Sequence, residues 1–168
     1  MKLLKIFNEE NVSQEKVDTF LKYKSVHAVL FDSENKIALF HTNKFKYHGI
    51  PGGGIVEGET VEQAIIRDCK EETGCNVQIV KEIGMTISVM DKKEQVNEAY
   101  CFILRVVGEI GEPSLTQEEV EEELVLEWVN LDKASEDVQN VIVCDNLYHD
   151  YIKMRTLVFL EKAKNLLI

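Results

Sequence analysis

The segment PGGGIVEGETVEQAIIRDCKEETGC, residues 51–75, constrains this chain more than any other part of it. Three consecutive glycines precede a stretch with helical spacing, on which Asp68, Glu71 and Glu72 stand three and four residues apart. Offsets of three and four return to one side of a helix, so these carboxylates share a sector of roughly 100°. Something must offset the repulsion between three like charges placed this close together.

The acidic sector of this segment coincides with an apolar one. The pattern predicts a helix over 60–73, because the capping-box sequence T-x-x-Q begins at Thr60 and Gly74 stands where helices commonly end in a left-handed residue. Val61 and Ala64 project into the carboxylate sector. The acids therefore lie on or beside an apolar face, where removing them from water is costly without compensation.

A divalent cation offsets these charges better than the protein does. Arg67 can pair with Glu71 at i,i+4, but one arginine does not balance three carboxylates. Mg²⁺ takes oxygen ligands from a few carboxylates and leaves positions for substrate phosphates. The usual interpretation of acidic helix residues, a solvated face, fits less well beside apolar neighbours. We therefore expect a metal here.

The remainder of the chain mixes strand and helix patterns around a turn-rich acidic connection at 108–123. The expected elements are a helix over 13–23, a β-hairpin of strands 25–31 and 36–42, longer strands over 76–90 and 98–107, a strand over 124–131 and helical structure from about residue 132 onward. This arrangement predicts an α+β fold with one mixed sheet between helices. His27, His41 and His149 fall within these elements and are expected to be structural.

The joint spacing of the glycines and charges resembles the box of the Nudix (MutT-like) hydrolases, G-x5-E-x7-R-E-U-x-E-E-x-G-U, with U a bulky apolar residue. Cys69 and Cys75 occupy two of the U positions, and Asp68 stands where the family has Glu, so its carboxylate is one methylene shorter. Six positions match outright: Gly53, Glu59, Arg67, Glu71, Glu72 and Gly74.

The resemblance implies a Nudix-type α/β/α sandwich forming a single domain over 1–168. It implies a hydrolase that cleaves a nucleoside diphosphate linked to another moiety, by attack of water on phosphorus, with Mg²⁺ or Mn²⁺ as cofactor. By position, Glu71 and Glu72 would be the main metal ligands. The Gly53 carbonyl would be a further ligand, and Asp68 would bind the metal directly or through water.

The resemblance also assigns supporting roles. Glu59 and Arg67 would pair and fix the geometry of the box. A base must take the proton of the attacking water, and in some family members this is a Glu on the loop before the strand that bears the Trp. Here that loop carries an acidic run at 118–123, in which Glu122 is the first choice and Glu119 the second. In other members a box carboxylate serves, and any one glutamate of this run can equally belong to a solvated cluster.

Substrate recognition is less constrained by the sequence. Phe45, Tyr47 and His48 lie just before the box, where an aromatic ring would either stack on a nucleobase or pack against the sheet. Arg105, in a predicted strand, would face either a substrate phosphate or a local acid. No further motif names the nucleotide derivative.

Composition restricts the partners. The 19 Lys and Arg residues stand against 30 Asp and Glu, giving a net charge of −11, which argues against a nucleic-acid polymer. No signal peptide and no membrane-length apolar run is present, so a small-molecule substrate and no membrane partner are expected. The C-terminal stretch 156–168 suits either a packing helix or a dimer contact, which leaves a homodimer open. The cysteines, with no CxxC pair, predict free thiols in a cytoplasmic protein: Cys69, Cys75, Cys101 and Cys144.

Two other functions compete with the hydrolase. The first is a sensor module that binds a nucleotide on the same fold without cleaving it. The intact box favours the enzyme, whereas Asp68 favours the sensor. The second is isomerase chemistry on a diphosphate ester, which needs additional acid and base groups, such as a cysteine outside the box, that the sequence does not locate.

Overall fold

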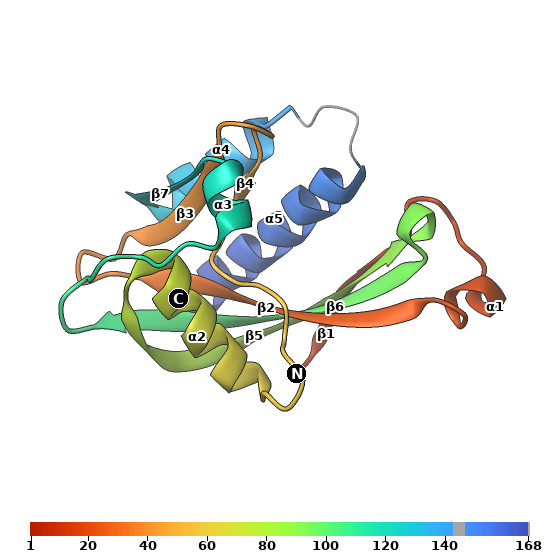
Figure 1. The fold of residues 1–168 in the computed structure, drawn as a ribbon, viewed down its shortest axis with the longest axis horizontal. Coiled ribbons are helices and arrows are strands. Elements are labelled where there is room, and N and C mark those ends of the chain that lie inside the picture. The colour runs from red at the N-terminus through yellow and green to blue at the C-terminus, as the bar shows by residue number, and fades with distance from the viewer. Residues whose placement is uncertain (143–146, 168) are drawn as a thin grey trace.

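The computed structural model describes residues 1–142 and 147–167, except for the side chains of Leu147 and Leu167. Its elements, labelled in Figure 1, are β1 (Leu3–Phe7), α1 (Gln14–Val17), β2 (Leu21–Phe31), β3 (Ile37–Thr42), β4 (His48–Gly49), α2 (Val61–Thr73), β5 (Asn76–Met90), η1 (Asp91–Lys93), β6 (Gln95–Val107), α3 (Gln117–Glu121), β7 (Leu124–Val129), α4 (Leu131–Asn140) and α5 (Leu147–Leu167). The strand order is β1-β5-β6-β2-β3-β4, with β7 paired to β3. The β1/β5 and β2/β6 pairs are parallel and the other pairs antiparallel, so the sheet is mixed.

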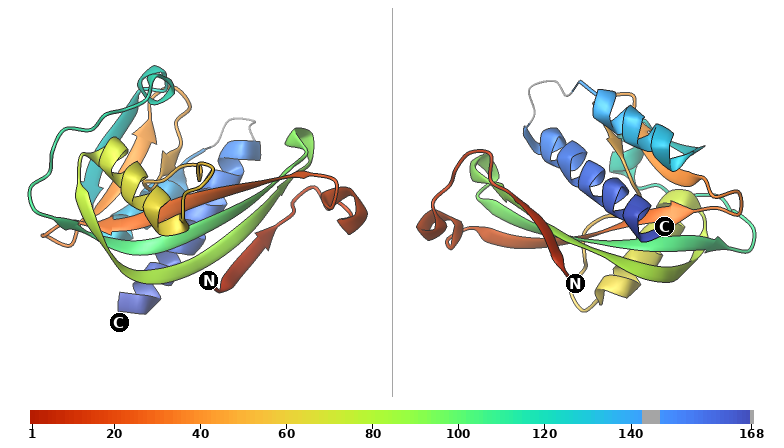
Figure 2. Two further views of the ribbon diagram at one scale, coloured as in Figure 1. Left: turned by 60° about the horizontal axis from the view of Figure 1, so that its bottom comes forward. Right: turned by 180° about the vertical axis from the view of Figure 1, so that it is seen from behind.

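Helices cover both faces of the long strands (Figure 2). Side chains alternate between the two faces of a strand, and both faces of β2 are apolar. Val29 of β2 packs in one cluster with Phe159 of α5, and Leu30 packs in another with Ile65 of α2. The fold is therefore the expected α+β sandwich, with the sheet between α2 on one side and α4 and α5 on the other.

The C-terminal segment packs within its own chain. Phe159, Leu160 and Ala163 of α5 are fully buried in the core. Over the described side chains of the C-terminal stretch, residues 156–166, this agrees with the packing alternative. Among the described helices, none combines the length and the apolarity needed to cross a bilayer.

Three of the four cysteines can be compared with the sequence prediction. Cys69, Cys75 and Cys101 are free and buried. Cys144 lies outside the described residues.

One sequence prediction of helix was wrong in its extent. The helix expected over 13–23 ends at Val17, and β2 already begins at Leu21. The reason is tertiary: β2 pairs with β6 from Leu21 onward, and Phe20 is buried beside it, so sheet formation outweighs local helical spacing. The helical structure expected from about residue 132 onward is present as two helices: α4 ends at Asn140, the backbone of Val141 is extended, and α5 begins at Leu147.

Besides the two-residue strand β4 and the short η1, two further elements had no counterpart in the sequence predictions. Strand β1 pairs with β5 at the edge of the sheet. The acidic connection at 108–123 contains the short helix α3, whose start carries a capping box between Thr116 and Glu119.

The glycine run holds the box against β2. The Ala28 amide donates to the Pro51 carbonyl and the Val26 amide donates to the Gly53 carbonyl, each at 2.9 Å. Gly52 has a φ of 143°, and a Cβ there would lie 2.0 Å from the Val26 carbonyl oxygen. Only glycine allows the loop to lie this close to the strand.

The predicted limits of the box helix are confirmed. The Thr60 side chain accepts from the Gln63 amide, the Gln63 side chain accepts from the Thr60 amide, and Gly74 is left-handed with a φ of 71°. These caps fix where α2 begins and ends, and hence which of its residues face the sheet.

The cap at Gly74 generates a stability prediction. A Cβ at Gly74 would lie 2.2 Å from the Gly111 carbonyl oxygen, whereas a Cβ at Gly58, which also has a positive φ, would meet nothing within 4 Å. We expect Gly58→Ala to lower the free energy of unfolding by about 1 kcal/mol through backbone strain alone. Gly74→Ala should cost at least about 1 kcal/mol more, because it adds overpacking. Equal losses in urea denaturation would contradict this account.

Candidate active site

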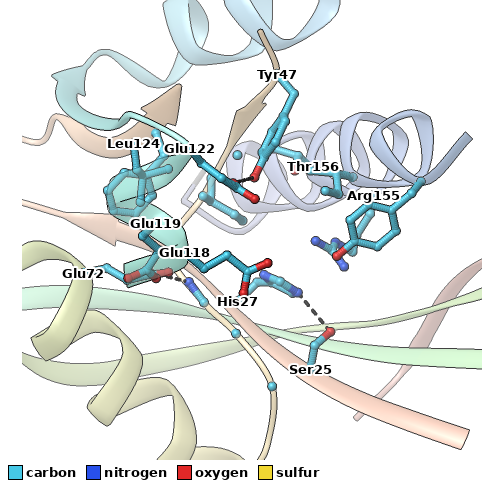
Figure 3. A pocket seen from close by; sticks show the side chains of 18 of the residues that line it. Ser25, His27, Tyr47, Glu72, Glu118, Glu119, Glu122, Leu124, Arg155 and Thr156 are labelled. Carbon is cyan, nitrogen blue, oxygen red and sulfur yellow. Dashed lines mark hydrogen bonds between the residues drawn. The ribbon is translucent and has the colours of Figure 1, made fainter. Parts of the chain in front are cut away.

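A cavity of about 290 Å³ is bordered by the glycine loop, β2, α3 and α5 (Figure 3). Its lining has two chemically different ends. Glu72 and Glu119 lie at one end of the view, and Arg155 and Ser25 lie at the other. The acidic part of the lining consists of Glu72, Glu118, Glu119 and Glu122.

Arg67 ties the loop of the box to its helix. Its Nε donates to Glu59 Oε1 at 2.7 Å and one Nη donates to Glu59 Oε2 at 2.8 Å, so the expected pair is present and bidentate. The same Nη donates to the Gly54 carbonyl at 3.1 Å. Hydrogen bonds from Arg67, and then from the Val56 amide, lower the pKa of Glu59 to about 2. Arg67 thereby positions the loop.

Asp68 is buried beneath the glycine loop. One of its oxygens, Oδ1, accepts from Arg67, while Oδ2 is buried with no hydrogen-bond partner among the described residues. A Cβ at Gly53 would lie 3.2 Å from Oδ2. Burial raises the pKa of Asp68 to about 6, although Arg67 opposes the shift. The carboxylate is thus close to the Gly53 backbone but outside the cavity lining.

Glu72 is the box carboxylate that reaches the cavity. Its Oε2 accepts a 2.8 Å hydrogen bond from the Gly52 amide. Burial raises the pKa of Glu72, and the charges of Glu119, Asp68 and Glu71 act in the same direction. Acidic groups from α2 and from the region of α3 therefore form one repelling cluster.

The two remaining metal-ligand candidates have partners of their own. Glu71 lies outside the lining and is partly exposed, with an oxygen 3.3 Å from an Arg67 Nη. Gly53 lines the cavity, and its carbonyl accepts from the Val26 amide, which leaves that oxygen one lone pair.

The donor set of this cluster suits a hard divalent cation. Within the described ranges, no three His, Cys, Asp or Glu side chains already converge as a metal site. However, among the residues that the structure describes, Asp68 Oδ2 is buried without a hydrogen-bond partner, and Glu72 accepts from one backbone amide, that of Gly52. Oxygen donors with unmet charge are what Mg²⁺ or Mn²⁺ binds, so these residues fit such an ion.

The acidic run before β7 is partly engaged. Glu119 accepts from the Thr116 amide at 2.6 Å and from the Thr116 hydroxyl at 2.9 Å, so it caps α3. Glu122 accepts from the Tyr47 hydroxyl at 3.1 Å at the cavity wall. Of the two candidate bases, Glu122 is therefore the one whose side chain is held at the cavity wall, because only its backbone takes part in the cap of α3.

The aromatic candidates mostly pack against the protein. The Tyr47 ring lines the cavity but stacks on His149, with centroids 4.8 Å apart. The Phe45 ring lies 5.3 Å from that of His149, and His48 pairs with His41 across β4 and β3. Phe45 and His48 lie outside the cavity lining. His48 lies in strand β4 of the sheet, and Phe45 is 38% exposed beside α5.

Arg105 also lies outside the lining. Its guanidinium donates to the Asn35 side chain at 3.1 Å, near the β2–β3 turn, and it lies 5.6 Å from the centre of the Phe31 ring. It therefore has a local partner that is not an acid.

Sequence reasoning missed the far end of the cavity, where Ser25, His27, Asn97 and Arg155 gather. They come from β2, β6 and α5, so no local spacing links them. One signal was present: polar residues at 25 and 27 within the otherwise apolar run SVHAVLF mark a strand face that is not ordinary core. Arg155 carries no such signal.

The comparisons with known proteins agree with this geometry. The NUDIX domain family model matches residues 21–147. A protein named ADP-ribose pyrophosphatase from Methanocaldococcus jannaschii is 31% identical over 116 residues, which are 67% of this chain and 67% of that protein.

Solved structures share the fold. A MutT protein from Methanosarcina mazei Go1 has a TM-score of 0.58 and 17% identity, covering 87% of this chain and 96% of that one. A C. elegans Ap4A hydrolase has a TM-score of 0.60 and 16% identity, covering 88% of this chain and 100% of that one. Fold, box and family match together identify an enzyme class that acts on phosphoanhydride bonds. The chain belongs to the Nudix family and is a Nudix hydrolase.

The buried His27 generates a pH prediction. Burial, and then the charge of Arg155, hold the pKa of His27 well below 6.5. The folded state keeps this ring neutral, while the unfolded state takes up a proton as the pH falls below 6.5. Stability is therefore fully present above that pH and is lost below it, at up to about 1.4 kcal/mol per pH unit.

We expect His27→Gln to lose less free energy of unfolding than the wild type between pH 7.5 and pH 5.5, in urea denaturation with EDTA. His41→Gln, at a partly exposed histidine of β3, is the matched control and should keep the wild-type pH dependence. An unchanged dependence in His27→Gln would show that this ring does not titrate as described.

Proposed function

We propose that this Nudix hydrolase is a divalent-metal-dependent pyrophosphohydrolase that cleaves a nucleoside diphosphate linked to another moiety. The observation that carries the proposal is the uncompensated carboxylate cluster at the cavity. Glu72 lines the cavity with a pKa raised by burial, and Asp68 keeps a buried oxygen without a partner among the described residues. The substrate would be a small nucleotide derivative, and the name of the 31% identical relative makes ADP-ribose the first compound to test.

Metal binding would use Glu72 and the free lone pair of the Gly53 carbonyl at the cavity, with Glu71 and Asp68 behind them. Mg²⁺ or Mn²⁺ held there would neutralise charge that develops on the diphosphate oxygens and assist the attacking water. Arg67 would keep the donors in place, since it bridges Glu59 and the Gly54 carbonyl.

Glu122 would act as the general base. The water oxygen forms a bond to phosphorus, Glu122 takes the water proton, and the bond from phosphorus to the bridging oxygen breaks. The electron pair leaves with that oxygen as a phosphate anion. The Tyr47 hydroxyl donates to Glu122 at 3.1 Å, which orients the carboxylate at the cavity wall.

A second candidate is a sensor that binds a nucleotide without cleaving it. Its support is Asp68, whose short side chain contacts Arg67 and lies outside the cavity lining. A sensor predicts nucleotide binding with no turnover on any compound, which the following experiment distinguishes.

Turnover should depend on Glu72. We expect phosphate release, through a coupled phosphatase, from a panel of ADP-ribose, nucleotide sugars, dinucleoside polyphosphates and nucleoside triphosphates, in Mg²⁺ or Mn²⁺ but not in EDTA. Glu72→Gln should lower kcat/KM by at least about 100-fold, because it removes charge that organises the transition state. Glu62→Gln, on the exposed face of α2, is the control and should behave as wild type. Full activity in Glu72→Gln would refute the assigned site.

The base assignment has its own test. Glu122→Gln should lower kcat by about 100-fold to 10,000-fold with little change in KM, as expected when a general base is removed. Glu121→Gln changes the charge equally at an exposed neighbour and should leave kcat unchanged. Comparable losses in the two variants would point to the charge of the loop instead of a base at Glu122.

A further inference from the structure

Arg155 lines the cavity without a role in the reaction described above. It projects from α5 at the end opposite Glu72 and is half-buried (Figure 3). Among the described residues, no hydrogen bond or ion pair holds its guanidinium, although glutamates line the same cavity. A cation withdrawn from water is costly to leave unpaired, so its placement is best explained by a ligand that pairs with it.

The groups around Arg155 are oriented to donate hydrogen bonds. Ser25 Oγ donates to Asn97 Oδ1 at 3.2 Å. His27 Nε2 lies 3.1 Å from the same hydroxyl, and because the serine proton is already used, a neutral His27 must donate there. In this chain of hydrogen bonds, from His27 to Ser25 to Asn97, the Asn97 side chain is engaged through its oxygen. Asn97 lines the cavity, so its side-chain N–H groups remain to bind a ligand.

The position of Arg155 in the chain separates it from the common machinery of the family. The family model ends at residue 147, and Arg155 lies beyond it on α5. The Phe159 and Leu160 side chains that follow are buried in the core, so the helix that carries the guanidinium is firmly placed. A rigidly mounted guanidinium recognises oxyanions well, because its planar N–H groups match two oxygens of a phosphate or carboxylate.

We propose that Arg155 and the Asn97 amide bind an oxyanion on the part of the substrate that lies beyond the scissile diphosphate. The preferred substrate then carries a second anionic group, either a phosphate or a carboxylate, in addition to the diphosphate at Glu72. This inference rests on the proposed hydrolase function for the position of the diphosphate. It predicts that ADP-ribose, whose terminal ribose is neutral, is a poorer substrate than a derivative whose second moiety is anionic.

Binding in the absence of metal tests the subsite directly. The probes are ribose 5-phosphate, ribonate and ribose, titrated in EDTA while the Arg155 Nε–H and Asn97 side-chain amide signals are followed by NMR. We expect binding of ribose 5-phosphate, ribonate or both, with neither signal moved by neutral ribose. The tighter of the two anions identifies the phosphate or the carboxylate as the recognised group.

Variants separate this subsite from general charge effects. Arg155→Gln should weaken binding of the anionic probe at least about 10-fold. Arg155→Lys keeps the positive charge but loses the paired N–H groups of the guanidinium, so it should retain part of the wild-type affinity. Arg105→Gln makes the same charge change outside the cavity and should bind as wild type. Unfolding temperatures of all variants verify that they are folded.

Three outcomes would overturn the proposal: no anionic probe binds the wild type, ribose binds as well as the anions, or Arg155→Gln binds as tightly as the wild type. Glu72→Gln should bind the probes like the wild type, because the two ends of the cavity are distinct. Absence of turnover in the wild type, with probe binding intact, would therefore count against the proposed hydrolase function and not against the subsite.

Discussion

The site depends on a charge imbalance that the fold creates and only partly corrects. Helix α2 uses one side both to pack against the sheet, through Ala64 and Ile65, and to place Asp68 in the same buried layer. Arg67 is the arginine that the box provides, and it is shared between Glu59, Asp68 and Glu71. Arg67 also donates a hydrogen bond to the Gly54 carbonyl, so the same side chain holds the glycine loop against the helix. The remaining negative charge is what a divalent cation would neutralise.

The charges that line the cavity differ between its two ends. Glu72 of α2 and Glu119 of α3 lie at one end, and Arg155 and Ser25 lie at the other, where the Ser25 hydroxyl contacts His27 and Asn97 (Figure 3). An extended anionic substrate fits such a cavity, with a metal-bridged diphosphate at the acidic end and a direct contact at the basic end.

How much of this could be predicted from the sequence follows from which interactions are local. The limits of α2, its capping box, the left-handed Gly74 and the Arg67–Glu59 pair all depend on residues within one short segment, and each was predicted. The start of β2 was missed because pairing with β6, distant in sequence, decides it. Arg155 was missed for the same reason. The polar residues that line the cavity with it belong to β2 and β6, which are distant from α5 in the sequence and pack beside it only in the folded chain. The surroundings of Phe45 were likewise beyond local sequence, because its neighbour His149 belongs to α5, which is distant in the chain.

The most direct test of the central claim is the unfolding temperature of the wild type as a function of Mn²⁺ concentration, without substrate and at constant ionic strength. A cation that neutralises the buried carboxylates binds the folded state and not the unfolded one. The free energy of unfolding should therefore increase by about 2.7 kcal/mol at a Mn²⁺ concentration a hundred times the dissociation constant. The unfolding temperature should rise steadily with the logarithm of the Mn²⁺ concentration. The rise should be largely lost in Glu72→Gln. An unfolding temperature that does not respond to Mn²⁺ would mean that the cluster does not bind a cation and that its charges are balanced in another way.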